Sequence, residues 1–233
     1  MKINILHYIE GSKNARGLTV IIDVFRAFSV TCYAIHNGAK QIIPVDTTGI
    51  AFRLKKENPE YLLMGERHER IVPGFDYGNS PTHIEHIDFT GKTIIQTTSA
   101  GTRGLVNATS ADEIITGSFV NAPAIIHFIQ SRDPEFVSLV AMGYAGTQPA
   151  DEDTFCARYI KNTLEGKPTN LAEMITALKA GSGKRFFDPE NVDHSPPRDF
   201  DLCLQLGIFD FVLKAEALGK NLISLKKLVY CIK

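Results

Sequence analysis

Short apolar runs alternate with amphipathic segments along most of this chain. Residues 18–24, Leu-Thr-Val-Ile-Ile-Asp-Val, are typical of a buried strand, whereas residues 26–36 repeat their apolar positions at helical spacing. Continuous apolar strands separated by helices favour a parallel sheet, because parallel strands need crossover helices and are buried on both faces. The alternation therefore predicts an α/β protein in which a mostly parallel sheet forms the middle of a layered α/β/α arrangement.

The same pattern predicts where the elements lie. The last third of the chain, from Thr169 onward, is predicted to be more helical. A chain of 233 residues without a low-complexity linker is expected to form a single α/β domain over residues 1–233, with any subdomain boundary near residues 110–120. The helical last third could supply the interface of a homo-oligomer. We expect strands over residues 3–8, 18–24, 40–45, 61–65, 93–96, 113–117 and 136–142, and helices over residues 26–36, 47–58, 121–130 and 151–164.

The composition narrows the functional class. A formal net charge of −1 gives no basic stripe for nucleic acid. No apolar run approaches the ~20 residues that a bilayer-spanning helix needs, and Met1 to Glu10 lacks the apolar core of a signal peptide. The cysteines lie far apart without a Cys-x-x-Cys pair, so we expect reduced, mostly buried thiols. We therefore expect a cytoplasmic protein that binds neither nucleic acid nor a membrane.

The segment from Lys92 to Ala108 is typical of a loop that binds an anion. An apolar run gives way to small hydroxylated residues and glycine, and a helical pattern follows. Backbone N–H groups at the start of a helix lack partners within the helix, and the helix dipole favours negative charge there. A strand-to-helix turn capped by a hydroxyl would look the same, so the loop alone does not decide its function. The candidate anion ligands of this loop are Thr97, Thr98, Ser99, Gly101, Thr102 and Arg103.

Charged residues follow several of the predicted strands. Asp23 and Arg26 follow one strand, and Glu66 and Arg67 follow another. Ligands of open α/β sheets bind beyond the carboxyl ends of the strands, so these side chains are expected to meet at one edge. Carboxylates bind Mg²⁺ and arginines bind phosphate oxygens, which together suit phosphoryl transfer. The other candidates at this edge are Asp76, Asn79, Ser80, Arg103, Ser118, Asn121, Asp151, Glu152 and Asp153.

Each of these residues also has a purely structural interpretation. Asp23 could pair with Arg26, and Glu66 could pair with Arg67. The acids at 151–153 could stabilise the N-terminus of a helix through its dipole. An acid at the end of an apolar strand is costly to bury unless it is paired or binds a metal, so Asp23 is the strongest functional candidate. A phosphatase that acts on a small molecule is the function that this set favours.

Three other classes of protein that act on or bind phosphate are disfavoured, because the chain lacks the motif that each of them requires. A cysteine phosphatase needs an arginine at a fixed distance after its cysteine, and neither Cys32 nor Cys156 has one there. A nucleotide-binding P-loop needs Ser or Thr after its lysine, whereas Arg185 follows Lys184. The Asp-x-Asp motif of haloacid-dehalogenase-like phosphatases would need an acid at Phe25. A nucleotide-dependent transferase is disfavoured for the same reason, since no glycine-rich nucleotide motif is present.

Six short segments, taken together, carry a resemblance to a known family. The most specific are the Gly-Phe-Asp-Tyr-Gly-Asn-Ser-Pro block at 74–81 and the threonine- and glycine-rich loop at 97–103. The set resembles the 2-phosphosulfolactate phosphatase family. The resemblance implies a Mg²⁺-dependent acid phosphatase of layered α/β fold that converts (R)-2-phospho-3-sulfolactate to 3-sulfolactate and phosphate, on a route toward coenzyme M. The six segments are residues 22–27, 65–67, 74–81, 97–103, 117–122 and 152–157.

The chain departs from the family pattern in two places. Ala100 stands where many relatives have Asn, and His68-Glu69 stands where a glycine is common. Loss of an amide donor would alter how the substrate is held. A phosphatase of the same family that acts on another small phosphorylated carboxylic acid is therefore the first alternative. A non-catalytic anion-binding protein is the second, and it would not need several carboxylates at the same edge.

The expected site follows from the residues and from the resemblance. Whether Asp23 attacks the phosphorus or binds the metal stays open at this stage. Asp23, Arg26 and Arg103 are the expected catalytic residues. The expected substrate-binding residues are Arg67, Asn79, Ser80, Thr97, Thr98, Ser99, Gly101, Thr102, Ser118 and Asn121. The expected ligands of Mg²⁺ are drawn from Asp23, Glu66, Asp76, Glu152 and Asp153.

Overall fold

The predicted alternation of strands and helices is confirmed in the computed structural model, which describes residues 1–219 and 222–229. The strands before the last third are β1 (Lys2–His7), β2 (Leu18–Ile22), β3 (Gln41–Pro44), β4 (Leu62–Arg67), β5 (Arg70–Ile71), β6 (Thr93–Thr97), β7 (Glu113–Gly117) and β8 (Phe136–Ala141). The helices in the same region are α1 (Tyr8–Lys13), α2 (Ala27–His36), α3 (Thr48–Glu57), α4 (Pro81–Ile84), α5 (Gly101–Asn107), the 3₁₀ turn η1 (Phe119–Asn121), α6 (Ala122–Arg132) and α7 (Asp151–Leu164).

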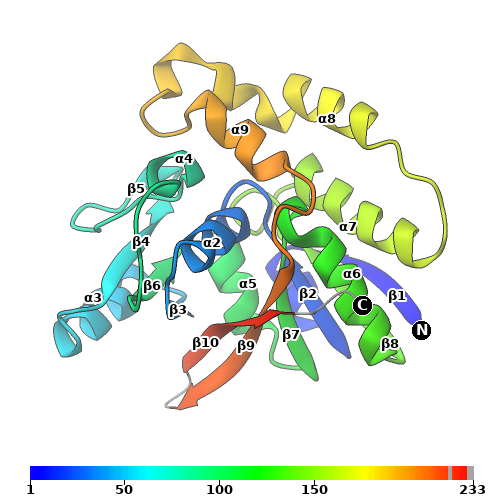
Figure 1. Cartoon of the computed structure of the whole chain (residues 1–233), viewed down its shortest axis with the longest axis horizontal. Coiled ribbons are helices and arrows are strands. Elements are labelled where there is room, and N and C mark those ends of the chain that lie inside the picture. Colours follow the sequence, from blue (N-terminus) through cyan, green and yellow to red (C-terminus); the bar gives the residue numbers. More distant parts are fainter. Residues whose placement is uncertain (220–221, 230–233) are drawn as a thin grey trace.

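The sheet contains two parallel halves. The strand order is β1-β8-β2-β7-β9-β10-β3-β6-β4-β5, where β9 and β10 come from the C-terminal part of the chain. Within one half, β2 pairs in parallel with β7 and β8, and β8 pairs in parallel with β1. Within the other half, β6 pairs in parallel with β3 and β4. Figure 1 shows the first half on the right of the molecule and the second half on the left.

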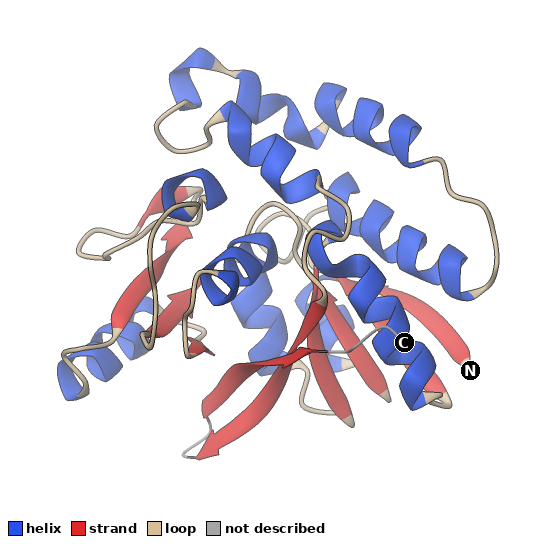
Figure 2. Cartoon of the chain, in the orientation of Figure 1, coloured by secondary structure: helices blue, strands red, loops and turns tan. Residues whose placement is uncertain are grey.

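Helices cover both faces of the sheet, as the layered prediction requires (Figure 2). Strand β2 shows why, because all of its residues are buried and successive side chains point to opposite faces. Ile21 belongs to the same apolar cluster as Phe28 of α2. Val20 belongs to a second cluster, with Phe128 of α6 and Ile160 of α7. The α/β/α arrangement with a mostly parallel sheet is therefore confirmed.

The last third is only partly helical, and this corrects the sequence prediction. It contains α8 (Leu171–Ala180), the 3₁₀ turns η2 (Ser182–Phe187) and η3 (Pro189–Asn191), and α9 (Pro197–Leu204), followed by the hairpin strands β9 (Phe211–Gly219) and β10 (Leu222–Val229). Residues 214–218 are Lys-Ala-Glu-Ala-Leu, good helix formers whose local preference is overridden by pairing within the sheet.

The β9–β10 hairpin joins the two parallel halves of the sheet. Strand β9 runs antiparallel to β7, with Ile115 opposite Lys214. Strand β10 runs antiparallel to β3, with Leu225 opposite Ile42. Both junctions are short, and the hairpin lies between the two halves in Figure 1. Residues 110–120, where a subdomain boundary was considered, contain β7, which lies inside this continuous sheet. The single domain over residues 1–233 stays a prediction.

The helical part of the last third lies beyond the carboxyl ends of the strands. Helix α9 contacts α2 and α4, and η2 contacts α8 and α9. Figure 1 shows α8 and α9, in yellow and orange, across the top of the molecule, above α7 and α4. No helix of residues 1–219 and 222–229 has the length and apolarity needed to cross a membrane. Cys231 lies outside the described residues.

Candidate active site

A cavity of about 440 Å³ lies at the carboxyl ends of strands from both halves of the sheet. The segments that follow β2, β4, β6 and β8, the first turn of α7 and the turn η2 all contribute residues to its wall. This is the location that the fold predicts for a ligand. The lining residues are Asp23, Phe25, Arg26, Asp46, Thr47, Thr48, Glu66, Arg67, His68, Glu69, Asn79, Ser99, Ala100, Arg103, Gly143, Tyr144, Ala145, Glu152 and Arg185.

Asp23 follows β2 and is almost fully buried at the cavity wall. Its Oδ1 accepts a hydrogen bond from the backbone N–H of Ala27 at 3.1 Å, and its Oδ2 accepts one from Gly101 at 2.9 Å. A Cβ atom on residue 101 would lie 2.8 Å from Asp23 Oδ2, so only glycine allows this approach. Burial, more than the charges of Glu66 and Glu152, raises the pKa of Asp23 to about 7 against these hydrogen bonds.

Glu66 ends its parallel strand in the other half of the sheet and faces the same cavity. Its Oε1 accepts from the backbone N–H of Ser99 at 2.6 Å, and its Oε2 accepts from the Ser99 hydroxyl at 3.1 Å. The backbone N–H of Glu69 donates to Oε2 at 3.0 Å. The loop after β6 therefore fixes acids of both sheet halves, since Ser99 holds Glu66 and Gly101 holds Asp23.

Three acids, Asp151, Glu152 and Asp153, open helix α7, and only Glu152 lines the cavity. Glu152 is buried at the wall, and its Oε2 has no hydrogen-bond partner within the described residues. Burial raises the pKa of Glu152, against smaller lowering effects of the Ser182 hydroxyl and the Arg185 charge. Asp153 lies behind the wall and accepts from the backbone N–H groups of residues 24 and 143, at 2.7 and 2.8 Å. Burial raises the pKa of Asp153 as well, with the charges of Asp23 and Glu152 adding to the shift.

Two arginines approach the cavity beside Asp46. Arg103 donates from Nε to Asp46 Oδ1 at 3.1 Å, and this pair is well exposed to solvent. Arg67 donates to the Asp46 carbonyl at 3.1 Å and to Thr97 Oγ1 at 2.7 Å. Burial lowers the pKa of Arg67. Arg67 also donates to the backbone carbonyl of Glu66 and not to its carboxylate, so the side-chain pair considered from the sequence is not formed.

Two further arginines approach the cavity beside Glu69. Arg185 of η2 forms an ion pair with the Glu69 carboxylate, and Arg26 donates to the Glu69 carbonyl at 3.4 Å. Arg26 forms its buried ion pair with Asp199 of α9, at 2.7 Å between Nη1 and Oδ2. The alternative pairing of Arg26 with Asp23 is therefore absent. The arginines predicted to be catalytic, Arg26 and Arg103, both line the cavity.

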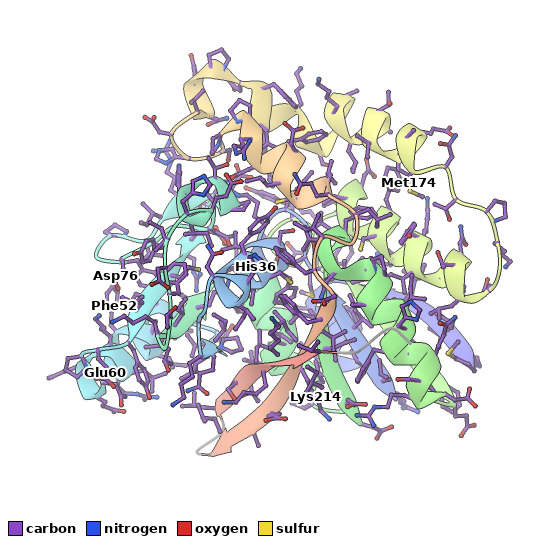
Figure 3. The ribbon with its side chains drawn as sticks, viewed as in Figure 1. His36, Phe52, Glu60, Asp76, Met174 and Lys214 are labelled. Atoms are coloured by element: carbon purple, nitrogen blue, oxygen red, sulfur yellow. The ribbon has the colours of Figure 1, made fainter. Side chains whose placement is uncertain are left out.

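Asp76 is a predicted metal ligand that, like Asp153, is not among the lining residues of the cavity. Its Oδ2 accepts from the backbone N–H of Leu63 at 2.8 Å and lies 3.7 Å from Lys55 Nζ. Figure 3 labels it beside Phe52, on the outer side of the β4 half. The cause is local, because the backbone N–H groups of Asp76 and Tyr77 both donate to the Leu63 carbonyl and hold this segment parallel to β4. The sequence placed Asp76 in a polar loop but did not show which way that loop returns.

Several predicted substrate-binding residues stabilise the structure around the cavity. Ser118 and Asn121 form the capping box of η1, and Asn121 also donates to the carbonyl of Phe211 at 3.3 Å. Ser80 donates to Asp199 Oδ1 at 2.8 Å. None of these three is among the lining residues of the cavity, whereas Asn79 is. The side chain of Asn79 is buried, and its Oδ1 has no partner in the described part of the chain.

The predicted anion-binding loop makes hydrogen bonds within itself and to the protein's own side chains. Thr98 and Thr102 bond to each other, with the N–H of Thr98 donating to Thr102 Oγ1 at 2.9 Å and the N–H of Thr102 donating to Thr98 Oγ1 at 3.2 Å. Thr97 accepts the hydrogen bond from Arg67. Of the six candidate ligands in this loop, Ser99 and Arg103 line the cavity and the other four stand behind them.

Sequence reasoning missed several residues that line the cavity or hold its lining residues from behind. Arg185 and Asp199 lie in the last third, whose return over the strand ends no local pattern indicates. Asp46, His68 and Glu69 line the wall but belong to no motif that spacing singles out. For His68 and Glu69, the sequence offered one signal, namely that a glycine is common at this place in the family. The structure explains that glycine, because both residues have a left-handed backbone, with φ of 54° and 65°.

The cavity fits an open metal site and not a closed one. No group of three or more His, Cys, Asp or Glu side chains within residues 1–219 and 222–229 has the arrangement of a metal cage. Mg²⁺ is commonly held by one or two carboxylates, with waters and substrate oxygens completing the shell. The unpartnered Oε2 of Glu152, and the presence of Asp23 on the wall of the same cavity, fit that arrangement. Asp23 and Glu152 are therefore the residues that would hold the ion.

Comparison with known proteins agrees with the resemblance carried by the motifs. Three curated relatives share the name "Probable 2-phosphosulfolactate phosphatase". The protein of Bacillus subtilis is 34% identical over 209 residues, 87% of this chain and 89% of the relative. The protein of Carboxydothermus hydrogenoformans is 36% identical over 223 residues, 91% and 92% of the two chains. The protein of Caldanaerobacter subterraneus is 39% identical over 210 residues, 84% and 87% of the two chains.

A family model described as 2-phosphosulpholactate phosphatase matches residues 4–217. The match includes all of the cavity-lining residues, from Asp23 to Arg185, and also Asp199. It therefore covers the strands of both parallel halves and the helices that lie over their carboxyl ends. The chain belongs to the 2-phosphosulpholactate phosphatase family.

Proposed function

We propose that this protein is a Mg²⁺-dependent acid phosphatase that hydrolyses (R)-2-phospho-3-sulfolactate to 3-sulfolactate and phosphate. The observation that carries the proposal is the meeting of Asp23, Glu66 and Glu152 with four arginines at one cavity. The names of the relatives support the choice of substrate. A location in the cytoplasm and a place on a route toward coenzyme M belong to the same proposal.

The arginines suit a substrate with several anionic groups. They form two pairs, Arg67 with Arg103 beside Asp46, and Arg26 with Arg185 beside Glu69. The substrate carries a phosphate, a sulfonate and a carboxylate. Arginine binds such groups through parallel N–H donors, so two separated pairs can hold the phosphate and the other acids at different ends of the cavity.

The chemistry expected of the site rests on charge and position. Phosphoryl transfer proceeds through a loose transition state whose charge spreads over the equatorial oxygens, and fixed cations stabilise that charge. Bound Mg²⁺ would polarise a phosphoryl oxygen and assist in activating the nucleophile. Burial raises the pKa of Asp23 to about 7 in the metal-free protein, and bound Mg²⁺ would favour its deprotonated carboxylate. Direct attack by Asp23 and activation of a water molecule are both compatible with its place at the wall.

A phosphate-release assay tests the proposal. The substrates are (R)-2-phospho-3-sulfolactate, phospholactate and 3-phosphoglycerate, each with Mg²⁺ and with EDTA. We expect release from the sulfonated substrate that needs Mg²⁺. No release from any of these substrates with Mg²⁺ would refute the phosphatase. Rapid acid quench during turnover of ³²P-labelled substrate then separates the two roles of Asp23, because only direct attack leaves phosphate covalently bound to the protein.

A phosphatase for another small phosphorylated carboxylic acid is the second candidate. The observation that favours it is the position of Ala100 and His68, which both line the cavity. These are the places where the chain departs from the family pattern, so the departures face the bound molecule. A kcat/KM for phospholactate above that for the sulfonated substrate would favour this candidate.

A further inference from the structure

We propose that Asp199 is a positioning residue that holds the guanidinium of Arg26 against the anion-binding wall of the cavity. The inference rests on the proposed function, because it assigns a role within the same site. Asp199 lies on α9 in the last third of the chain, and no motif or spacing singled it out. Its side chain is fully buried and does not line the cavity, so it acts through Arg26.

The carboxylate of Asp199 is fixed through both oxygens. Oδ2 accepts from Arg26 Nη1 at 2.7 Å. Oδ1 accepts from the hydroxyl of Ser80 at 2.8 Å, and from the backbone N–H and the hydroxyl of Thr82 at 2.9 and 2.6 Å. A carboxylate with both oxygens bonded inside the protein has one orientation available. The Gly-Phe-Asp-Tyr-Gly-Asn-Ser-Pro segment, which ends at residue 81, therefore helps to set the direction of Arg26 through Asp199.

The guanidinium of Arg26 is only partly used by these contacts. Nη1 donates to Asp199 and, at 2.6 Å, to the carbonyl of His194. Nη2 makes one long hydrogen bond to the carbonyl of Glu69. Phe186 lies against the planar face, 5.8 Å from Cζ to the ring centroid. The remaining N–H groups, on Nε and Nη2, make no hydrogen bond within the described residues and are available to an anion in the cavity.

The Arg26–Asp199 ion pair differs from a purely structural ion pair because one of its partners, Arg26, lines the cavity. Buried ion pairs between elements are common, and loss of one partner leaves an uncompensated charge. Arg26 differs because it lines the cavity wall while it is held from behind. When Asp199 loses its charge, Arg26 is free to turn toward other acceptors, and anion affinity falls even if the fold survives. If the ion pair served only to hold α9 in place, loss of the Asp199 charge would lower the stability of the protein and leave its affinity for the anion unchanged.

The test compares Asp199→Asn, Asp199→Glu and Glu85→Gln with the wild type. Glu85 forms an exposed ion pair with Arg198, the neighbour of Asp199 on α9, and supplies the matched control. Calorimetric titration with inorganic phosphate gives Kd in the presence of Mg²⁺, and kinetics with the phosphorylated substrate give KM and kcat. We expect Asp199→Asn to raise Kd and KM about ten-fold or more, the scale of one lost charge-assisted hydrogen bond. Asp199→Glu should recover part of the affinity, and Glu85→Gln should leave it unchanged.

The outcomes separate this inference from the proposed function. If the wild type releases no phosphate yet binds it, and Asp199→Asn weakens the binding, the phosphatase fails and the positioning role stands. Unchanged Kd and KM in a folded Asp199→Asn protein would overturn the positioning role. If that variant does not fold, Ser80→Ala decides, because it removes one donor to Asp199 and leaves the ion pair. A higher Kd in Ser80→Ala supports the role, and an unchanged Kd overturns it.

Discussion

Asp23 and Glu66 come from opposite halves of the sheet, yet each is held by a backbone N–H of the same short loop. Gly101 donates to Asp23 at 2.9 Å, and Ser99 donates to Glu66 at 2.6 Å. The loop after β6 thus sets the spacing of acids that lie far apart in the sequence.

Gly101→Ala is expected to disturb the carboxylate of Asp23. The added Cβ would lie 2.8 Å from Asp23 Oδ2 and 3.0 Å from Ala27 Cβ. We expect a loss of stability of about 1–3 kcal/mol, typical of overpacking, together with a lower kcat for phosphate release. Gly49→Ala is the matched control, because its Cβ would meet nothing closer than 3.9 Å and its stability should change by less than about 1 kcal/mol. Urea denaturation and kinetics of the two variants check this, and equal effects would contradict it.

Two buried asparagines are expected to behave differently on substitution by alanine. Asn121 bonds to the N–H of Ser118 and the carbonyl of Phe211, so Asn121→Ala leaves both groups unpaired and should cost about 1–3 kcal/mol. Its KM should not change. Asn79 lines the cavity with Oδ1 unpartnered in the described chain, so Asn79→Ala should raise KM with a smaller loss of stability. Thermal unfolding and KM measured on both variants test the distinction, which fails if the two profiles are exchanged.

The raised pKa of Asp23 predicts how stability depends on pH without divalent metal. Burial favours the protonated form, which moves the pKa from 3.8 to about 7. The stabilisation is fully present below pH 3.8 and is lost as the pH rises through about 7. In EDTA, the free energy of unfolding of the wild type should therefore fall from pH 5 to pH 8 more than that of Asp23→Asn. Parallel curves for the two proteins would show that Asp23 is not the group concerned.

Three thiols are expected to be unreactive in the folded protein. Cys32, Cys156 and Cys203 are fully buried, and burial raises the pKa of each above its usual value. Because the thiolate is the reactive form, iodoacetamide at pH 8 should modify none of them until the protein unfolds. Peptide mass spectrometry before and after denaturation in urea measures this. Modification of any of the three in the native protein would show that its environment is more open than described.

The sequence singled out the acids at the strand ends as functional candidates, because an acid at the end of an apolar strand is costly to bury. Asp23 directly follows β2 and Glu66 lies just before the last residue of β4, and parallel strands bring their carboxyl ends to one edge. Their contacts were not predictable, since the donors, Ser99 and Gly101, were expected to bind an external anion. Side-chain direction within a loop depends on how the loop packs, which local sequence does not determine.

The strands and the cavity contacts of the last third could not be predicted from the local sequence, because they depend on packing against the rest of the sheet. The hairpin β9–β10 contains good helix formers, and its strands form because they complete the sheet between the two halves. Arg185 reaches the cavity, and Asp199 reaches Arg26 from behind the cavity wall, only because η2 and α9 pack over the strand ends. Asp76 was predicted at the cavity from the motif that contains it, and the return of that segment along β4 places it outside.

Phosphate release from (R)-2-phospho-3-sulfolactate by Asp23→Asn and Asp76→Asn, measured beside the wild type with Mg²⁺, tests the central claim most directly. Both changes replace an acid of the family motifs with its isosteric amide, but only Asp23 lies at the cavity wall. We expect Asp23→Asn to lose about 100-fold or more in kcat, and Asp76→Asn to stay within a few-fold of the wild type. A fully active Asp23→Asn protein, or an equal loss in Asp76→Asn, would contradict the placement of the chemistry in this cavity.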